Sequence, residues 1–218
     1  MDLHCGIDEA GRGPVLGPLV VCGVAIEPGR HGRLARLGLR DSKALPARER
    51  ERLAAAIRDT GALVRLRVCP ARVVDVARRR NELNVLEVKA MAAIIRALAP
   101  SHVWVDGLTT RPGAFGRRLE ALVLPVRARV VSESRADERY PLVQAASIIA
   151  KVTRDAAISS LAREHGEIGS GYPGDPRTRA FLRRCIAAGV FPAFVRRSWS
   201  TLARLESRDG GNRVGWGS

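Results

Sequence analysis

The sequence has little of what marks secreted, membrane-bound or zinc-binding proteins. Its 218 residues include only 4 cysteines. None of Cys5, Cys22, Cys69 and Cys185 belongs to a CxxC pair or lies near a histidine at zinc-ligand spacing. No apolar run nears the roughly 18 residues that a membrane-spanning helix needs, and no basic stretch leads into an apolar core near the N-terminus. We therefore expect a cytoplasmic protein whose cysteines are buried, reduced thiols.

Acidic residues are also scarce relative to basic ones. Lysine and arginine number 37 against 22 aspartates and glutamates, which gives a formal net charge of +15. An excess of this size predicts a polyanionic partner, with nucleic acid as the first expectation and a membrane surface as the second. No long basic amphipathic helix supports the membrane alternative. The plainest alternative is a protein that is simply rich in arginine.

The apolar pattern predicts strands early in the chain and then strands that alternate with helices. Expected strands cover residues 3–7, 19–26, 63–69, 103–105 and 126–131. Expected helices cover about 46–57, 70–80, 84–98, 115–122, 141–163, 177–188 and 191–205. This order is typical of one α/β domain, residues 1–206, with helices over a mixed sheet. The Gly-rich tail, residues 207–218, is expected to be disordered.

The residues after the first expected strand carry a chemical signal. Asp8 and Glu9 are adjacent carboxylates whose repulsion a divalent cation would relieve. Gly11, Arg12 and Gly13 follow, and their backbone N–H groups and guanidinium favour an anion. Metal-binding acids next to an anion-binding loop suggest phosphate chemistry. A hairpin turn with polar residues at its tip is the alternative.

Two further aspartates extend the pattern. Asp106 ends a short apolar strand as Asp8 does, so the two carboxylates converge if their strands are neighbours. Asp137 lies in a polar stretch that precedes a helix. Four acids without a nearby histidine or cysteine suit a two-metal phosphoryl site that holds Mg²⁺ or Mn²⁺. The alternatives are a turn-forming Asp-Gly for Asp106 and a solvated charge for Asp137.

Taken together, these motifs resemble type 2 ribonuclease H, the ribonuclease HII family. The opening signature covers residues 6–13, and five more motifs follow in the family's order. They are Asp41-Ser42-Lys43, residues 105–107, Ala136-Asp137 with Tyr140-Pro141, residues 145–152 with Arg154-Asp155, and residues 169–173. The last motif resembles the archaeal and eukaryotic branch, and the resemblance as a whole covers about residues 3 to 205.

The resemblance implies a ribonuclease H-like fold, with a mixed five-stranded sheet flanked by helices and a C-terminal helical part. It implies a metal-dependent endoribonuclease acting on RNA/DNA hybrids and on the 5′ side of single ribonucleotides in duplex DNA. The expected products carry 5′-phosphate and 3′-hydroxyl ends, and the expected role is ribonucleotide excision repair. Asp8, Glu9, Asp106 and Asp137 match the family's catalytic, metal-binding acids, with Mg²⁺ or Mn²⁺ as cofactor.

Substrate recognition is likewise implied by the resemblance. Gly11, Arg12 and Gly13 match the loop that reads the ribose 2′-hydroxyl, the group that separates RNA from DNA. Tyr172 matches a tyrosine that stacks near the RNA–DNA junction. The structural alternative for Tyr172 is a ring that covers the core beneath a Gly-rich loop.

Three more residues resemble phosphate-contacting positions of the family: Lys43, Ser147 and Lys151. Ser147 and Lys151 are four residues apart, so they share one face of the expected helix. Helix packing for Ser147 and solvation for Lys151 are the structural alternatives.

Rival interpretations are a ribonuclease HIII-like hybrid nuclease, a non-catalytic nucleic-acid-binding protein on the same fold, and a DDE-type recombinase. The presence of all four acids and of Tyr172 favours ribonuclease HII. Some family members carry a C-terminal sliding-clamp motif that begins with glutamine, whereas Gln144 is the only glutamine here. The tail therefore does not support a sliding-clamp partner, and we expect a monomer.

Overall fold

A computed structural model describes residues 2–39, 45–107 and 112–210 of the chain. The fold divides into two compact units. The first consists of Met1–Ala10, Val20–Val68 and Asn84–Thr153; the second consists of Gly11–Leu19, Cys69–Leu83 and Arg154–Ser218. Lys43, an expected phosphate contact, lies outside the described residues. A functional domain over residues 1–206 stays a prediction.

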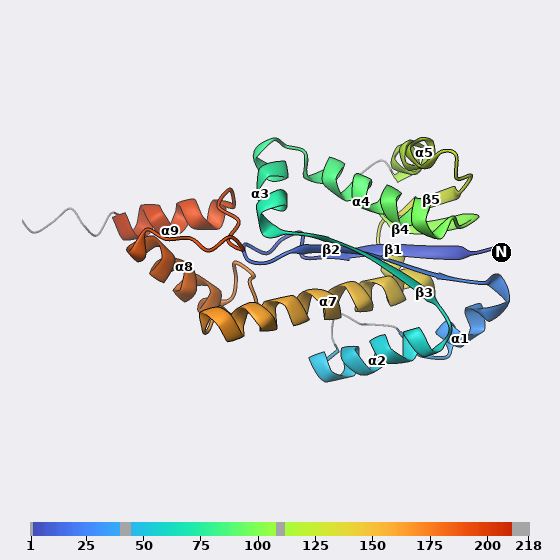
Figure 1. Cartoon of the computed structure of the whole chain (residues 1–218), viewed down its shortest axis with the longest axis horizontal. Helices are drawn as coiled ribbons and strands as arrows, with labels where there is room; N and C mark the ends of the chain where they lie inside the picture. Colours follow the sequence, from blue (N-terminus) through green and yellow to red (C-terminus); the bar gives the residue numbers. More distant parts are fainter. Residues whose placement is uncertain (1, 40–44, 108–111, 211–218) are drawn as a thin grey trace, which may run out of the picture. The chain divides into compact units, whose positions relative to one another are not determined.

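The first unit is built on a mixed five-stranded sheet with the strand order β3-β2-β1-β4-β5 (Figure 1). The strands are β1 (His4–Ala10), β2 (Leu19–Ile26), β3 (Leu63–Cys69), β4 (His102–Asp106) and β5 (Arg129–Glu133). β1 runs antiparallel to β2 and parallel to β4, and β4 runs parallel to β5. This arrangement confirms the expected fold class.

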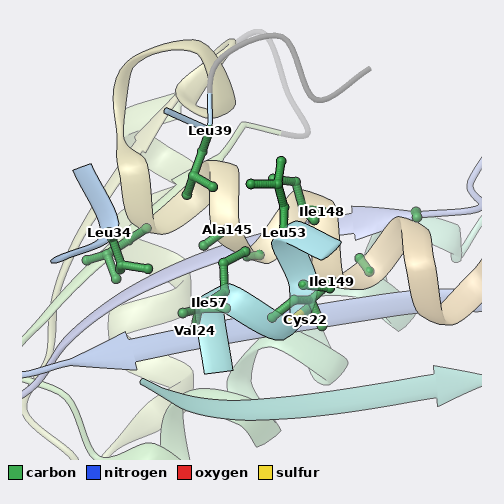
Figure 2. Packing of buried hydrophobic residues seen from close by; sticks show 14 of the residues in the cluster. Cys22, Val24, Leu34, Leu39, Leu53, Ile57, Ala145, Ile148 and Ile149 are labelled. Carbon is green, nitrogen blue, oxygen red and sulfur yellow. The ribbon is translucent and has the colours of Figure 1, made fainter. Parts of the chain in front are cut away.

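Helices cover both faces of this sheet (Figure 1). The helices of this unit are η1 (Pro28–Arg30), α1 (His31–Ala35), α2 (Ala47–Asp59), α4 (Leu83–Leu98), α5 (Pro112–Val123), α6 (Ala136–Arg139) and the first part of α7 (Pro141–His165). A hydrophobic core joins β1 and β2 to α1, α2 and α7 (Figure 2). In α7 the buried residues Ala145, Ile148 and Ile149 recur at helical spacing, which gives the helix a continuous apolar face.

The beginning of α7 lies directly against β1. A Cβ atom at Gly6 would collide with the backbone of Leu142 and Val143. Glycine at position 6 therefore permits a close approach that a larger residue would prevent. The approach matters for the site because Ser147 follows on the same helix.

The second unit contains α3 (Ala71–Arg79), the remainder of α7, α8 (Pro176–Ala188) and α9 (Ser200–Gly210). The helix expected over residues 191–205 is wrong in its first half, because α9 begins only at Ser200. The residues before it instead pair with the loop that follows β1. Arg196 N–H donates to Val15 O at 2.8 Å, and Gly17 N–H donates to Phe194 O at 2.9 Å. α9 also continues to Gly210, past the expected boundary at 206.

Two findings bear on the cysteines and on possible membrane-spanning helices. All four cysteines are free thiols, and Cys5 and Cys22 are buried in β1 and β2 as expected. Over the ranges that the structure describes, no helix has both the length and the apolarity to cross a membrane.

Candidate active site

Three carboxylates of the first unit, Asp8, Asp106 and Asp137, influence one another electrostatically near the end of its parallel strands. β1 and β4 are parallel neighbours, so Asp8 and Asp106 lie at the same edge of the sheet. Asp137 belongs to α6, and the residue before it, Ala136, donates its backbone N–H to Asp106 Oδ1 at 3.0 Å. One hydrogen bond thus ties the end of β4 to the helix that carries Asp137.

Asp8 and Glu9 lie inside strand β1. The sequence predicted a strand that ends at Ile7, but pairing with β2 continues, with Asp8 opposite Cys22 and Glu9 opposite Val21. Because strand side chains alternate, the two carboxylates point to opposite faces of the sheet. Asp8 is 5% exposed, whereas Glu9 is half-buried. The adjacent pair therefore has two different environments.

The charge of Asp8 is opposed by its surroundings. The pKa of Asp8 is raised to about 7, first by burial and further by the carboxylates of Asp106 and Asp137. Hydrogen bonds from the Ser147 hydroxyl and the Glu9 backbone N–H act in the opposite direction, the latter at 2.8 Å from Asp8 Oδ1. A buried acid among other acids is a setting in which a divalent cation relieves repulsion.

Ser147 and Lys151 lie four residues apart on α7, as expected. Ser147 is 8% exposed, and its hydroxyl hydrogen-bonds the Asp8 carboxylate. Lys151 is half-buried. Ser147 therefore supports a predicted catalytic acid directly, and the phosphate contact expected for each residue stays a prediction.

The donor set suits a hard divalent cation in kind. All four predicted ligands are carboxylates, which Mg²⁺ and Mn²⁺ prefer over nitrogen or sulfur donors. Within residues 2–39, 45–107 and 112–210, no three His, Cys, Asp or Glu side chains are gathered as they would be around an ion. Support for a cation site comes instead from the chemistry of the donors and from their place in the fold.

The Gly-Arg-Gly loop, residues 11–13, belongs to the second unit. Gly11 has a φ of +99°, and a Cβ there would lie 2.5 Å from Pro18 O, so the fold requires glycine. Gly13 is exposed, and a Cβ there would meet nothing within 4 Å. The backbone at Gly13 is therefore open to close approach by a ligand.

The carbonyl groups of this loop are held by two residues that the sequence analysis missed. Arg196 Nη1 donates to Arg12 O at 3.3 Å and to Pro14 O at 2.9 Å. Trp199 Nε1 donates to Gly13 O at 2.9 Å. Arg196 carried no local signal, because it is one of 37 basic residues and its burial comes from distant parts of the chain.

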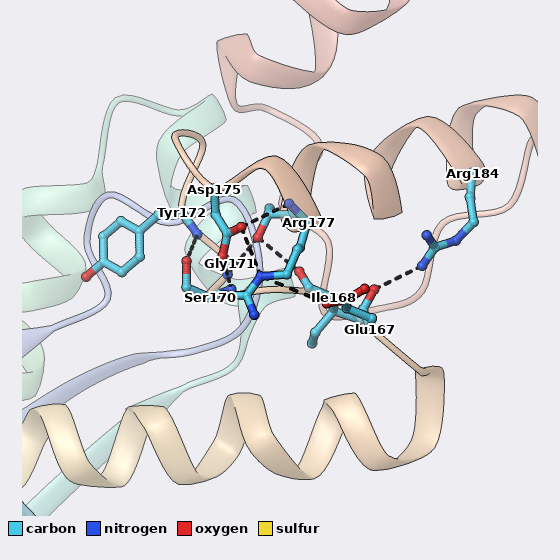
Figure 3. Close-up of polar contacts among 9 residues, drawn as sticks. Glu167, Ile168, Ser170, Gly171, Tyr172, Asp175, Arg177 and Arg184 are labelled. Carbon is cyan, nitrogen blue, oxygen red and sulfur yellow. Dashed lines mark hydrogen bonds and ion pairs between the residues drawn. The ribbon is translucent and has the colours of Figure 1, made fainter. Parts of the chain in front are cut away.

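Tyr172 lies in a loop whose backbone is fixed by Asp175 (Figure 3). The Asp175 carboxylate accepts the N–H of Ser170 at 2.7 Å and that of Arg177 at 2.9 Å. These bonds, that of Ser170 above all, hold the pKa of Asp175 well below its usual range. The Tyr172 ring is 38% exposed, and the Arg154 guanidinium lies 4.8 Å from its centroid. The ring therefore packs on the buried Arg154 while staying partly exposed, and its contact with substrate stays a prediction.

Comparison with known proteins decides the family. The model of the Ribonuclease HII family matches residues 5–202 of the chain. The chain belongs to the ribonuclease HII family. Ribonuclease HII of Thermococcus onnurineus is 42% identical over 207 residues, which cover 93% of this chain and 89% of the relative. The protein is therefore an endoribonuclease, a hydrolase of the ribonuclease H type that acts on RNA/DNA hybrids.

Solved structures of ribonuclease HII share the fold. The ribonuclease H2 of Pyrococcus horikoshii superposes with a TM-score of 0.86 at 37% identity, covering 94% of this chain and 98% of that chain. The ribonuclease HII of Archaeoglobus fulgidus, solved in a complex with PCNA, gives a TM-score of 0.84 at 42% identity, covering 90% and 95%.

The ribonuclease HIII alternative shares the fold alone. Bst-RNase HIII in complex with Mn²⁺ superposes with a TM-score of 0.78 at 21% identity, covering 95% of this chain and 70% of that chain. The match to the ribonuclease HII model, and not this likeness, decides between the two families.

Proposed function

We propose that this ribonuclease HII cleaves the 5′ side of single ribonucleotides embedded in duplex DNA, as well as the RNA strand of hybrids. Its products carry 5′-phosphate and 3′-hydroxyl ends. Asp8, Glu9, Asp106 and Asp137 are the catalytic acids and hold Mg²⁺ or Mn²⁺. The observation that carries the proposal is the group formed by Asp8, Asp106 and Asp137, in which burial and like charge together oppose ionisation of Asp8.

The chain's own groups prepare these carboxylates. The Ala136 N–H fixes one oxygen of Asp106. The Ser147 hydroxyl and the Glu9 N–H favour the ionised form of Asp8, which is the form that ligates a cation. Bound divalent cations supply activation of the attacking water and stabilisation of the leaving 3′ oxygen.

In this proposal, residues of the second unit recognise the ribonucleotide, and residues of the first unit add phosphate contacts. The Gly-Arg-Gly loop offers the Gly13 N–H and the Arg12 guanidinium to the ribose 2′-hydroxyl and its phosphate. The partly exposed Tyr172 ring stacks on the following sugar. Lys43, Ser147 and Lys151 are further phosphate contacts.

On this proposal the enzyme acts as a cytoplasmic monomer in the removal of misincorporated ribonucleotides. The A. fulgidus relative was solved with PCNA, whereas the only glutamine in this chain is Gln144. A sliding-clamp partner is therefore not part of the proposal.

Replacing Asp106 by asparagine tests the assignment of the acids. Asp106→Asn keeps the acceptor for the Ala136 N–H but removes the charge that a cation needs. Cleavage of duplex DNA with one ribonucleotide should fall roughly 100- to 1,000-fold, because charge stabilisation at the reacting phosphate is lost. The assay is run with Mg²⁺, Mn²⁺ or EDTA, the product ends are mapped, and duplex binding is measured alongside.

Asp59→Asn is the matched control, because Asp59 is an exposed aspartate of the same unit. It should cleave like the natural chain and lose activity in EDTA. Turnover retained by Asp106→Asn would remove Asp106 from the site, and activity retained in EDTA would remove the cation.

A further inference from the structure

We propose that Arg196 is a positioning residue for ribonucleotide recognition. Its buried guanidinium holds the Gly-Arg-Gly loop by the carbonyl side, so that the opposite, N–H side of Gly13 is presented to the substrate. The inference rests on the proposed function of the loop as the 2′-hydroxyl reader. All the residues that carry it belong to the second unit.

Arg196 is a fully buried cation whose contacts converge on one loop. It is 0% exposed, and its guanidinium lies 4.9 Å from the centroid of the Trp199 ring. Nε donates to Gly17 O at 3.0 Å, and Nη1 donates to Pro14 O and Arg12 O. Burying a cation is costly, and an apolar side chain of similar volume often stabilises a fold as well. The directional fork, which an apolar residue lacks, is therefore the property that this position uses.

The direction of these bonds fixes the direction of the loop's donors. In a trans peptide, the C=O of one residue and the N–H of the next point opposite ways. Arg12 O is bound to Arg196, so the Gly13 N–H points away from the guanidinium. Pro14 has no N–H, and the N–H of Val15 is occupied by Gly171 O at 2.8 Å. Among the backbone hydrogen bonds of residues 2–39, 45–107 and 112–210, none uses the Gly13 N–H as donor, so from Gly13 to Val15 this is the N–H that remains for a ligand.

Two features make this donor suited to a ligand. The space beside Gly13 is open, since a Cβ there would meet nothing within 4 Å. A charge-assisted hydrogen bond to the carbonyl of Arg12 also polarises the peptide group that carries the Gly13 N–H, which strengthens that donor.

The same loop is joined to the segment that carries Tyr172. Gly171 O accepts the N–H groups of Val15 at 2.8 Å and Leu16 at 3.3 Å. Arg154, which lies over the Tyr172 ring, donates Nη2 to Ser170 O at 2.9 Å. A loop held by Arg196 therefore also fixes the backbone next to the second recognition residue.

Arg196→Lys is the central test, because lysine keeps the charge but cannot reach three carbonyl groups at once. Single-turnover cleavage of duplex DNA with one ribonucleotide should fall about 100-fold, the usual consequence of a misplaced recognition group. The Kd for that duplex should change less than about threefold, since phosphate contacts dominate it. Hydrogen exchange at the Gly13 amide should accelerate.

Arg204→Lys is the matched control, because Arg204 is an exposed arginine of α9 that bonds only its own helix at Ser200 among the described contacts. It should match the natural chain in cleavage, in Kd and in Gly13 exchange.

Trp199→Phe is a second, milder variant. It keeps an aromatic ring against Arg196 and removes only the Nε1–H that binds Gly13 O. Cleavage should fall about fivefold, the usual effect of one lost hydrogen bond, with the Kd preserved. This variant keeps the proposal open to refutation if Arg196→Lys does not fold.

Three outcomes overturn the proposal. If both variants cleave as fast as the natural chain, Arg196 is only a packing residue. The same conclusion holds if the loss of cleavage is no larger than the loss of folded protein. An unchanged Gly13 exchange rate in Arg196→Lys also overturns it, whatever the activity. If the natural chain fails to cleave at single ribonucleotides, the proposed function fails instead, and the exchange measurement still decides whether Arg196 holds the loop.

Discussion

Gly11 and Gly13 are two residues apart, yet their surroundings are opposite. Gly11 is enclosed and left-handed, whereas Gly13 has open space on the side where a Cβ would stand. The fold therefore explains the first glycine, whereas no contact among the described residues requires the second. This contrast predicts a structural role for Gly11 and a functional role for Gly13.

Alanine at each position tests that contrast. Gly13→Ala should change the free energy of unfolding by no more than about 0.5 kcal/mol but lower single-ribonucleotide cleavage at least about tenfold, because its methyl group fills the space that the substrate needs. Gly11→Ala should destabilise the fold by about 1–3 kcal/mol, because alanine is strained at this φ. Urea unfolding and single-turnover cleavage measure both effects. Full activity of Gly13→Ala would assign the open space to solvent.

At the residue scale, the sequence indicated candidate acids but not the burial of two arginines. Asp8 and Asp106 could be recognised because each lies at or near the end of an apolar run, where an unpaired charge is costly to bury. Arg154 and Arg196 are 1% and 0% exposed, but their neighbours in the sequence do not indicate that they are buried. Their burial is produced by loops that lie far away along the chain.

At the element scale, α3 anchors the segment that carries Arg196. Asp75 of α3 is buried and accepts the Ser198 N–H at 2.7 Å and Arg79 Nη2 at 2.5 Å. Burial alone would raise the pKa of Asp75, but these hydrogen bonds outweigh it and hold the pKa below its usual range. The ionised carboxylate therefore contributes to stability.

The sign of this effect gives a pH-dependent prediction. A lowered folded-state pKa contributes stability above the unfolded value of about 3.9, and this contribution is lost as pH falls through the folded value. Asp75→Asn should therefore destabilise the chain by about 1–2 kcal/mol near neutral pH, and this difference in the free energy of unfolding should shrink as the pH falls below about 3.9. Urea unfolding of Asp75→Asn, with the exposed Glu206→Gln as control, measures it. A gap independent of pH would assign the loss to packing.

Elements were predicted well where periodicity alone decides them. The helices around 84–98 and 141–163 and the sheet strands were found, because their apolar faces repeat regularly. The end of β1 and the stretch before α9 were misjudged for a shared reason. Polar residues such as Asp8 and Glu9 are kept in strand by pairing with β2, and residues 194–196 are kept out of helix by pairing with residues 15–17. Such long-range pairing cannot be predicted from the neighbouring residues in the sequence.

At the scale of the whole molecule, the net charge of +15 sets the response to salt. Each phosphate that a basic residue neutralises releases a counterion, so affinity falls steeply as salt rises. Between about 50 and 200 mM salt, the affinity for an all-DNA duplex should fall at least about 100-fold. The single-turnover cleavage rate at saturating enzyme should change little, because bound complexes are already formed. A flat binding curve would show that the basic excess does not face the duplex.

The fold class could be predicted from the sequence, whereas the division into two units could not. The class follows from strands alternating with helices and from motifs in family order. The two units are assembled from separated segments, so no linker or change of composition marks their boundary.

The bond from Arg196 to Arg12 O spans 184 residues of sequence. A ribosome therefore finishes the acids and the Gly-Arg-Gly loop long before it makes the side chain that holds the loop. A chain that ends between Asp137 and Arg196 carries every predicted metal ligand but lacks the side chain that supports the Gly-Arg-Gly loop. Selective cleavage is thus expected only from a chain that has been synthesised at least as far as Arg196.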